Sequence, residues 1–249
     1  MSPVAVTPLV PLAQNGPVIP NFGRGDECIR TNGKFCLNWF LDNFDERFLP
    51  RVGEHLKMTA IAIVIGFVIA FGAALIAHRH SRFELPFANV ASLFYTIPSI
   101  AFFQIMVPIT GIGWTSILIA LVSYTLLILF RNILTGLREV PADVREAAEG
   151  MGLTRRQQLL RVELPLAMPA IIAGLRVATV TTISLATIAA FITPLGLGAP
   201  IFSAIQTGAN TEFVAASLLA IALALIADAA IVFVQRALTP WSRARSPAT

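Results

Sequence analysis

Charged residues are scarce in this 249-residue chain: they make up 13% of it, whereas 56% of the residues are hydrophobic. About a quarter of the residues in a soluble domain are charged, so this composition excludes a soluble protein and indicates a membrane protein. The formal net charge is +4. The basic residues lie beside apolar runs, which membrane topology explains better than nucleic-acid binding does.

Motifs for nucleotide binding and catalysis are also missing. The only Gly-Lys step is Gly33-Lys34, which Phe35 follows, and no glycine stands five positions before it, so the chain lacks the phosphate loop of an ATPase. It also has no GxSxG, HExxH, CxxC or paired-carboxylate arrangement. His78 and His80 lack the carboxylates that accompany a metal site. The sequence therefore predicts no enzymatic activity, no cofactor and no metal.

Cysteine occurs only at Cys28 and Cys36, in an N-terminal segment rich in proline, glycine and asparagine. We expect residues 1–50 to form a loosely ordered tail outside the cytoplasm, without a cleaved signal peptide. A disulfide between the two cysteines is compatible with that location. Because spacing alone does not fix the geometry, a disulfide and two free thiols both remain open.

A short amphipathic segment over about 37–48 closes this tail. We predict that it forms a helix at the membrane interface, with an apolar side made by Trp39, Phe40, Phe44 and Phe48. The alternative is that the helix contacts a partner subunit or a binding protein.

Apolar runs suited to crossing a hydrocarbon layer of about 30 Å occupy most of the remaining chain. The predicted spans are about 56–77, 86–108, 115–130, 168–192 and 213–234. The expected fold class is an all-α polytopic protein of the cytoplasmic membrane, with its membrane domain over 51–236 and a cytoplasmic tail over 237–249.

The distribution of arginines predicts the topology of these spans. The predicted outer loops at 109–114 and 193–212 contain no basic residue. The segments that alternate with them contain Arg79, Arg82, Arg131, Arg138, Arg145, Arg155, Arg156, Arg161, Arg236, Arg243 and Arg245. Because positive charge accumulates on the inner side, the N-terminus is predicted outside and the C-terminus inside.

The polar loop between the third and fourth spans reads as two short helices. Pro141 suits the first turn of one helix, and Gly152 suits its end. A small apolar face follows from Val144, Ala147, Ala148 and Met151. Thr154 and Gln157 have the spacing of a capping box for the second helix, which is predicted to finish near Leu164-Pro165.

Polar residues within the spans are candidates for lining a pathway. Pro98 must kink or split the second span, and freed backbone groups survive at membrane depth only against protein or water. The candidates are Tyr95, Thr96, Pro98, Ser99 and Gln104 in that span, with Thr181 and Ser184 in the fourth. The alternative is that the hydroxyls bond to their own helix or to a neighbouring helix.

Two charges, Arg176 and Asp228, lie inside the fourth and fifth spans. The two helices run in opposite directions, and each charge lies about 12 Å from the cytoplasmic end at 1.5 Å per residue. Intramembrane charges are costly unless paired. We therefore predict an ion pair that joins the two helices, with a substrate or proton role as the alternative.

The polar loop resembles the EAA loop of binding-protein-dependent ABC importer permeases. The similarity lies in Glu146-Ala147-Ala148, Gly152 and Leu164-Pro165, at the steps that this family uses. It implies that Glu146, Ala147, Ala148, Met151, Gly152, Leu164 and Pro165 couple the chain to an ATPase, which binds the ATP.

Further stretches are similar to the osmoprotectant branch of that family. They are TIPSIAFF at 96–103, the run at 111–137, the run at 146–180 and Ala186–Gly198. The chain departs from the family at Ile192-Thr193-Pro194-Leu195, where a glycine-rich turn is usual. The resemblance implies a type I importer (MetI-like) fold that works by alternating access. The implied partners are two ATPase subunits, a second permease copy or paralogue, an extracytoplasmic solute-binding protein and the lipid bilayer, but no nucleic acid.

The implied substrate is glycine betaine, choline, carnitine or a similar quaternary ammonium compound. Because the EAA loop does not encode the substrate, an amino acid or a betaine-like thiol compound is the alternative. A membrane scaffold or sensor without transport is a second alternative.

Overall fold

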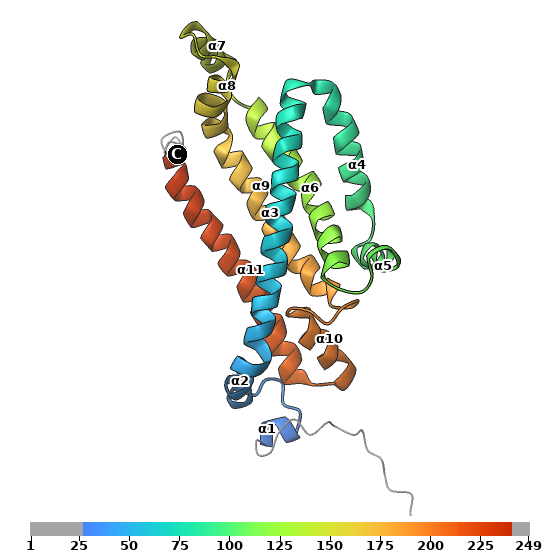
Figure 1. Ribbon diagram of the computed structural model, residues 1–249. Coiled ribbons are helices and arrows are strands. Elements are labelled where there is room, and N and C mark those ends of the chain that lie inside the picture. The colour runs from blue at the N-terminus through green and yellow to red at the C-terminus, as the bar shows by residue number, and fades with distance from the viewer. Residues whose placement is uncertain (1–26, 241–249) are drawn as a thin grey trace, which may run out of the picture.

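The computed structural model describes residues 27–240, and every regular element among them is helical (Figure 1). The N-terminal elements are α1 (Glu27–Arg30), α2 (Leu37–Asn43), η1 (Phe44–Phe48), α3 (Leu49–Arg79) and η2 (Ser81–Phe83). The central elements are α4 (Glu84–Thr96), α5 (Ser99–Thr110), α6 (Trp114–Arg138), α7 (Ala142–Gly150), α8 (Arg155–Gln158) and η3 (Leu159–Glu163). The last are α9 (Leu164–Ala189), α10 (Gly198–Thr207) and α11 (Asn210–Leu238).

Four continuous helices in the described residues are long and apolar enough to cross a membrane: 37–79, 114–138, 155–189 and 210–238. A fifth crossing results if the pair 81–96 and 99–110, bent by 100°, counts as one broken span. The predicted break at Pro98 is confirmed, because Ile97 and Pro98 are extended between α4 and α5. A residue before proline is driven out of the helical region in this way.

Small residues let α3, α6 and α9 pack closely at the centre of the bundle. A Cβ added at Gly66 of α3 would lie 1.9 Å from Thr125 Oγ1 on α6, and one at Gly174 of α9 would lie 2.4 Å from Asn132 Cβ. Alanines along α3 are buried in the same core. Such small-residue contacts are how helices approach one another where the surrounding lipid gives no hydrophobic drive to association.

The segment 37–48 is helical, as predicted, but it is not separate from the first span; its place at the membrane interface stays a prediction. It runs without a break through the π-helical turn η1 into α3. Its apolar side packs against protein, since Trp39 and Phe48 are buried with Ala215 and Ala216 of α11. Residues 27–36 of the predicted loose tail also have defined structure, whereas 1–26 lie outside the described residues.

The second helix of the polar loop does not finish at Leu164-Pro165, so that prediction is wrong. Residues 155–189 form one continuous helix, with the π-helical turn η3 just before Pro165. The backbone N–H of Leu164 reaches the carbonyl of Leu159, five residues back. A local π adjustment lets a helix accommodate a proline that would otherwise break it.

Most helices extend beyond the predicted spans, although α9 ends at Ala189 and the predicted span ended at 192. The third span extends past 130 to Arg138, and the fifth begins at Asn210 and reaches Leu238. The loop predicted over 193–212 contains the helix α10. Hydropathy marks only the apolar part of each helix, so the polar turns at the ends were missed.

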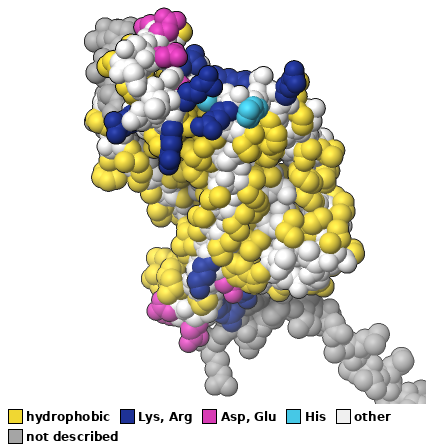
Figure 2. All heavy atoms as spheres, turned by 45° about the horizontal axis from the view of Figure 1, so that its top comes forward, with side chains coloured by type: hydrophobic (Ala, Val, Ile, Leu, Met, Phe, Trp, Pro, Cys, Tyr) yellow, Lys and Arg dark blue, Asp and Glu magenta, His cyan; other side chains and the backbone are white. Residues whose placement is uncertain are grey.

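The bundle has two distinct ends. One, called the α7 end, carries α7, α8, the turn between α3 and α4 and the last residues of α11; the other, called the α10 end, carries α1, α2, α5 and α10 (Figure 1). Figure 2 shows Lys and Arg side chains gathered toward the α7 end and apolar side chains over the middle. This placement agrees with the predicted topology, whose orientation across the membrane stays a prediction.

Candidate functional site

The helix α7 and the turn after it form the tip of the α7 end. Gly152 has φ +78°, a left-handed conformation that ends α7 and that side chains with a Cβ rarely adopt. The predicted capping box is present, since Thr154 N–H donates to Gln157 Oε1 at 2.9 Å and Gln157 N–H to Thr154 Oγ1 at 3.4 Å. The left-handed Gly152 and the hydrogen bonds of the capping box therefore fix the turn between α7 and α8.

The small-residue face of α7 is divided between the protein and its surroundings. Ala148 is buried, whereas Glu146 and Ala147 are exposed and Met151 is 71% exposed. The exposed residues form a surface at the tip of the α7 end that another protein can contact. Leu164 and Pro165 are half-buried at the start of α9, where the polar loop joins the bundle.

A buried carboxylate lies at the base of this loop. Glu163 is 6% exposed. Its Oε2 lies 2.9 Å from His78 Nε2 at the end of α3, and its Oε1 accepts from Gln158 Nε2 at 2.9 Å. Sequence reasoning missed Glu163, although an acid at the apolar edge of a span, with histidines at the end of another, was a usable signal.

A polar cavity of about 560 Å³ opens beside this carboxylate. It lies between the end of α3, α7 and α8, and its lining includes Arg79, His80, Glu149 and Arg155 as well as His78 and Glu163. The cavity is thus bounded by the polar loop on one side and by the first long helix on the other.

The two intramembrane charges meet. Arg176 Nε donates to Asp228 Oδ1 at 2.8 Å, and its second nitrogen donates to Oδ2 at 2.9 Å. About a third of each side chain is exposed. The parallel pair of bonds joins α9 to α11, as predicted, and it has the geometry in which arginine binds a carboxylate most strongly.

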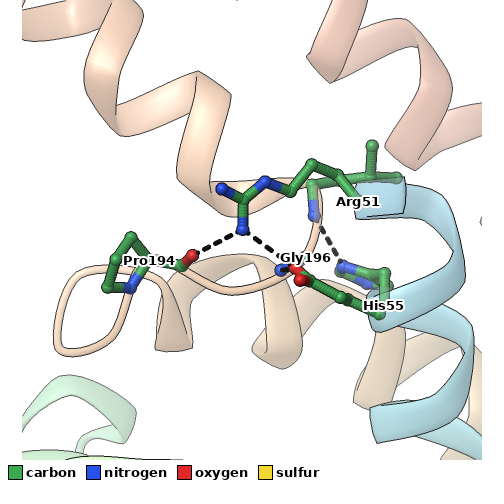
Figure 3. Close-up of polar contacts among 6 residues, drawn as sticks. Arg51, His55, Pro194 and Gly196 are labelled. Atoms are coloured by element: carbon green, nitrogen blue, oxygen red, sulfur yellow. Dashed lines mark hydrogen bonds and ion pairs between the residues drawn. The ribbon is translucent and has the colours of Figure 1, made fainter. Parts of the chain in front are cut away.

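At the α10 end, side chains of α3 hold the turn between α9 and α10 (Figure 3). Arg51 donates to the carbonyl of Pro194 at 2.8 Å, and Glu54 accepts from the N–H of Gly196 at 3.0 Å. Below them, His55 is fully buried. The turn held here is the one in which the sequence departs from the usual glycine-rich pattern.

The bonds of His55 define its protonation. The N–H of Leu197 donates to Nδ1 at 3.3 Å, so Nδ1 is an acceptor. The proton therefore resides on Nε2, which donates to the carbonyl of Ile183 at 3.1 Å. A neutral ring thus satisfies one backbone group of α9 and one of the following turn. No periodic pattern or motif in the sequence indicates this contact.

The pathway candidates fall into two separate groups. Ser184 lines a cavity of about 390 Å³ between α9, α10 and α11, together with Thr187, Ser217 and apolar residues; no residue of α4 or α5 lines it. Thr96 and Ser184 hydroxyls donate to Ser92 and Val180 of their own helices. Tyr95, Pro98 and Gln104 are exposed, and Ser99 and Thr181 are half-buried.

The break at Pro98 has its own support. Tyr124 of α6 donates its hydroxyl to the carbonyl of Ile97, a group that the interrupted helix leaves free. Tyr95 packs its ring edge-on against Tyr124, with ring centroids 6.1 Å apart. The tyrosine hydroxyl thus satisfies one backbone carbonyl of the break. Such a partner is needed because lipid tails cannot hydrogen-bond a free backbone group.

The N-terminal segment is fastened to the α10 end. Cys28 and Cys36 form a disulfide. Within the loop that it closes, the Asn32 side chain donates to Gly208 O at 2.7 Å and accepts from Asn210 N–H at 3.1 Å. The loop therefore clips the turn between α10 and α11.

Comparisons with known proteins give a consistent result. Residues 62–243 match the family described as "Binding-protein-dependent transport system inner membrane component". The chain is 31% identical over 201 residues to the glycine betaine/carnitine/choline transport system permease protein OpuCB of Bacillus subtilis, covering 81% of this chain and 93% of that protein. It is 36% identical over 167 residues to the ergothioneine transport permease/ergothioneine binding protein EgtU of Helicobacter pylori, covering 67% and 30%.

The fold also matches a solved structure, an inward-facing conformation of the MetNI methionine ABC transporter. The TM-score is 0.67 at 23% identity, with 76% of this chain and 94% of that chain covered. At this identity the likeness concerns the fold.

Proposed function

This chain belongs to the binding-protein-dependent inner membrane components, as a type I ABC importer permease of the osmoprotectant branch, and we propose that it imports a small quaternary ammonium solute. Glycine betaine, choline and carnitine are the proposed substrates, because the name of the similar OpuCB specifies them. The proposed partners are two ATPase subunits, a second permease copy or paralogue and an extracytoplasmic solute-binding protein.

The observation that carries the coupling role is the position of α7. Glu146, Ala147 and Met151 are exposed at the tip of one end, on a helix whose termination and restart are fixed by Gly152 and the capping box. A short helix with small exposed residues suits docking in a groove of another protein. We assign that groove to the ATPase, which supplies the ATP hydrolysis.

The continuity of α8, η3 and α9 supplies the route of coupling. Displacement of α7 and α8 by the ATPase is passed along one helix from Arg155 to Ala189. This helix carries Ser184 and Thr187, which line the cavity between α9, α10 and α11. Alternating access then consists of rocking this helix and its neighbours about the pathway.

The lining of that cavity fits a weakly bound solute. It combines three hydroxyls with isoleucine, leucine and alanine side chains and contains no charged residue. Such a surface passes a methylated cation without holding it by an ion pair. Selectivity then resides in the binding protein, where aromatic rings attract quaternary ammonium groups by cation–π interaction.

A betaine-like thiol compound is the second candidate substrate. Its support is the 36% identity to a permease whose name specifies ergothioneine. That compound and the osmoprotectants share a trimethylammonium group, so an uncharged, partly hydroxylated lining suits both.

Uptake measurements test the proposed function. The chain is reconstituted in liposomes with its ATPase and binding protein, and uptake of glycine betaine, choline, carnitine, ergothioneine and methionine is measured with and without ATP. We expect ATP-dependent uptake of a quaternary ammonium compound. Uptake of methionine alone would contradict the proposed substrate class, and the absence of any ATP-dependent uptake would contradict the permease role.

A further inference from the structure

The buried carboxylate of Glu163 joins three parts of the molecule. Glu163 is the last residue of η3, directly before α9. His78 approaches it from the end of α3, and Gln158 approaches it from α8, each at 2.9 Å. Within residues 27–240, the bond to His78 is the one side-chain hydrogen bond between α3 and the segment 142–163.

An ionised Glu163 can only accept these bonds. Gln158 donates through its amide nitrogen, and the carboxylate oxygen facing His78 accepts, so His78 Nε2 carries the proton. A carboxylate with so little exposure is stable only while its oxygens are paired, and an unpaired one is costly. Separation of α8 from α3 therefore carries an energetic penalty at this residue.

An open space borders this contact. The cavity of about 560 Å³ separates α7 and α8 from the last turn of α3. Glu149 lines this cavity from α7, is exposed, and makes no ion pair or hydrogen bond through its side chain among the described residues. The cavity leaves space between the polar loop and α3, while the base of the loop is attached by the bond from Glu163 to His78 and by Leu159, which packs against the core that includes Ala77.

We propose that Glu163 is a positioning residue for coupling, which transmits displacement of the polar loop to α3 through His78. The inference rests on the proposed function, because it assumes that an ATPase moves α7 and α8. It adds a second route to the one along α9: α3 holds the turn between α9 and α10 through Arg51, Glu54 and His55. Movement at the α7 end would thereby reach the α10 end through α3 as well.

The test compares Glu163→Gln with Glu149→Gln in the reconstituted importer. The first variant keeps the shape of the side chain but removes its charge, so a bond to His78 can persist only as a weaker bond between neutral groups. The second neutralises an acid on the same cavity whose side chain makes no hydrogen bond or ion pair among the described residues. We expect both complexes to assemble and hydrolyse ATP. Solute imported per ATP hydrolysed should fall about tenfold in Glu163→Gln, the loss expected for a hydrogen bond to a charged group, and stay unchanged in Glu149→Gln.

A swapped pair separates transmission from folding. His78→Glu combined with Glu163→His restores the bond with its partners exchanged, and we expect it to recover much of the lost ratio. If Glu163→Gln imports as much solute per ATP hydrolysed as the wild type does, the inference is overturned. Uptake by the wild type would still support the proposed function. Failure of Glu163→Gln to assemble, without recovery in the swapped pair, would also overturn it by assigning the residue to folding alone.

Discussion

At the scale of single residues, the α10 end depends on a turn that only glycine fits. Gly196 has φ +60°, and a Cβ there would lie 2.9 Å from His55 Nδ1. The neighbouring N–H of Leu197 donates to that same ring nitrogen. The backbone conformation and the histidine contact therefore require each other.

The variant Gly196→Ala should destabilise the protein. The left-handed conformation alone costs about 1–2 kcal/mol with a Cβ, and displacement of His55 adds to that cost. Thermal unfolding in detergent measures the effect. Gly53→Ala on α3 is the control, since it has no neighbour within 4 Å and no positive φ; it should stabilise by about 0.5–1 kcal/mol. Equal shifts in both variants would contradict the close fit.

The ion pair between α9 and α11 gives a second prediction at this scale. Asp228→Ala leaves Arg176 without its carboxylate, and we expect a lower unfolding temperature and loss of most uptake, with Asp228→Asn intermediate. Exchanging the two residues should restore much of both. Additive defects without rescue by the exchange would show that the two charges act independently.

At the scale of elements, the loop of α7 and α8 combines a rigid joint with an exposed surface. The capping box begins α8, and Gly152 ends α7. The helix then continues through a π-helical turn into α9 instead of stopping. In the proposed function, a displacement of α7 would reach this membrane helix through the short turn at 151–154.

Gly152→Ala tests the joint. Its φ of +78° strains any residue with a Cβ by about 1–2 kcal/mol, although no atom lies within 4 Å. We expect weaker co-purification of the ATPase and faster proteolysis around 150–154. Gly150→Ala, inside α7 and also without close neighbours, should leave both unchanged. Faster cleavage in Gly150→Ala as well would refute the special role of the joint.

At the scale of the whole molecule, the predicted orientation follows from two opposite ends. Both cysteines in the sequence are bonded to each other, so single cysteines can be introduced without background labelling. Met151→Cys replaces a residue that is 71% exposed at the α7 end, and Leu41→Cys one that is 60% exposed at the α10 end. An impermeant maleimide on intact cells should label Leu41→Cys alone. Labelling of Met151→Cys instead would invert the topology.

The sequence by itself determined whatever depends on local patterns. Hydropathy predicted the membrane class and the approximate spans. Pro98 predicted the broken helix, and the spacing of Thr154 and Gln157 predicted the start of a helix. Even the Arg176 and Asp228 pair followed from sequence, because antiparallel helices make depth calculable from residue counts.

Only the tertiary structure decided which distant groups meet. His78 bonds Glu163 across 85 positions, and His55 bonds the turn at Leu197 across 142. It also decided that 37–48 continues into α3 and that Pro165 does not end a helix. The physical reason is that a helix end or a polar contact of this kind is fixed by the surfaces packed against it, and these come from remote parts of the chain.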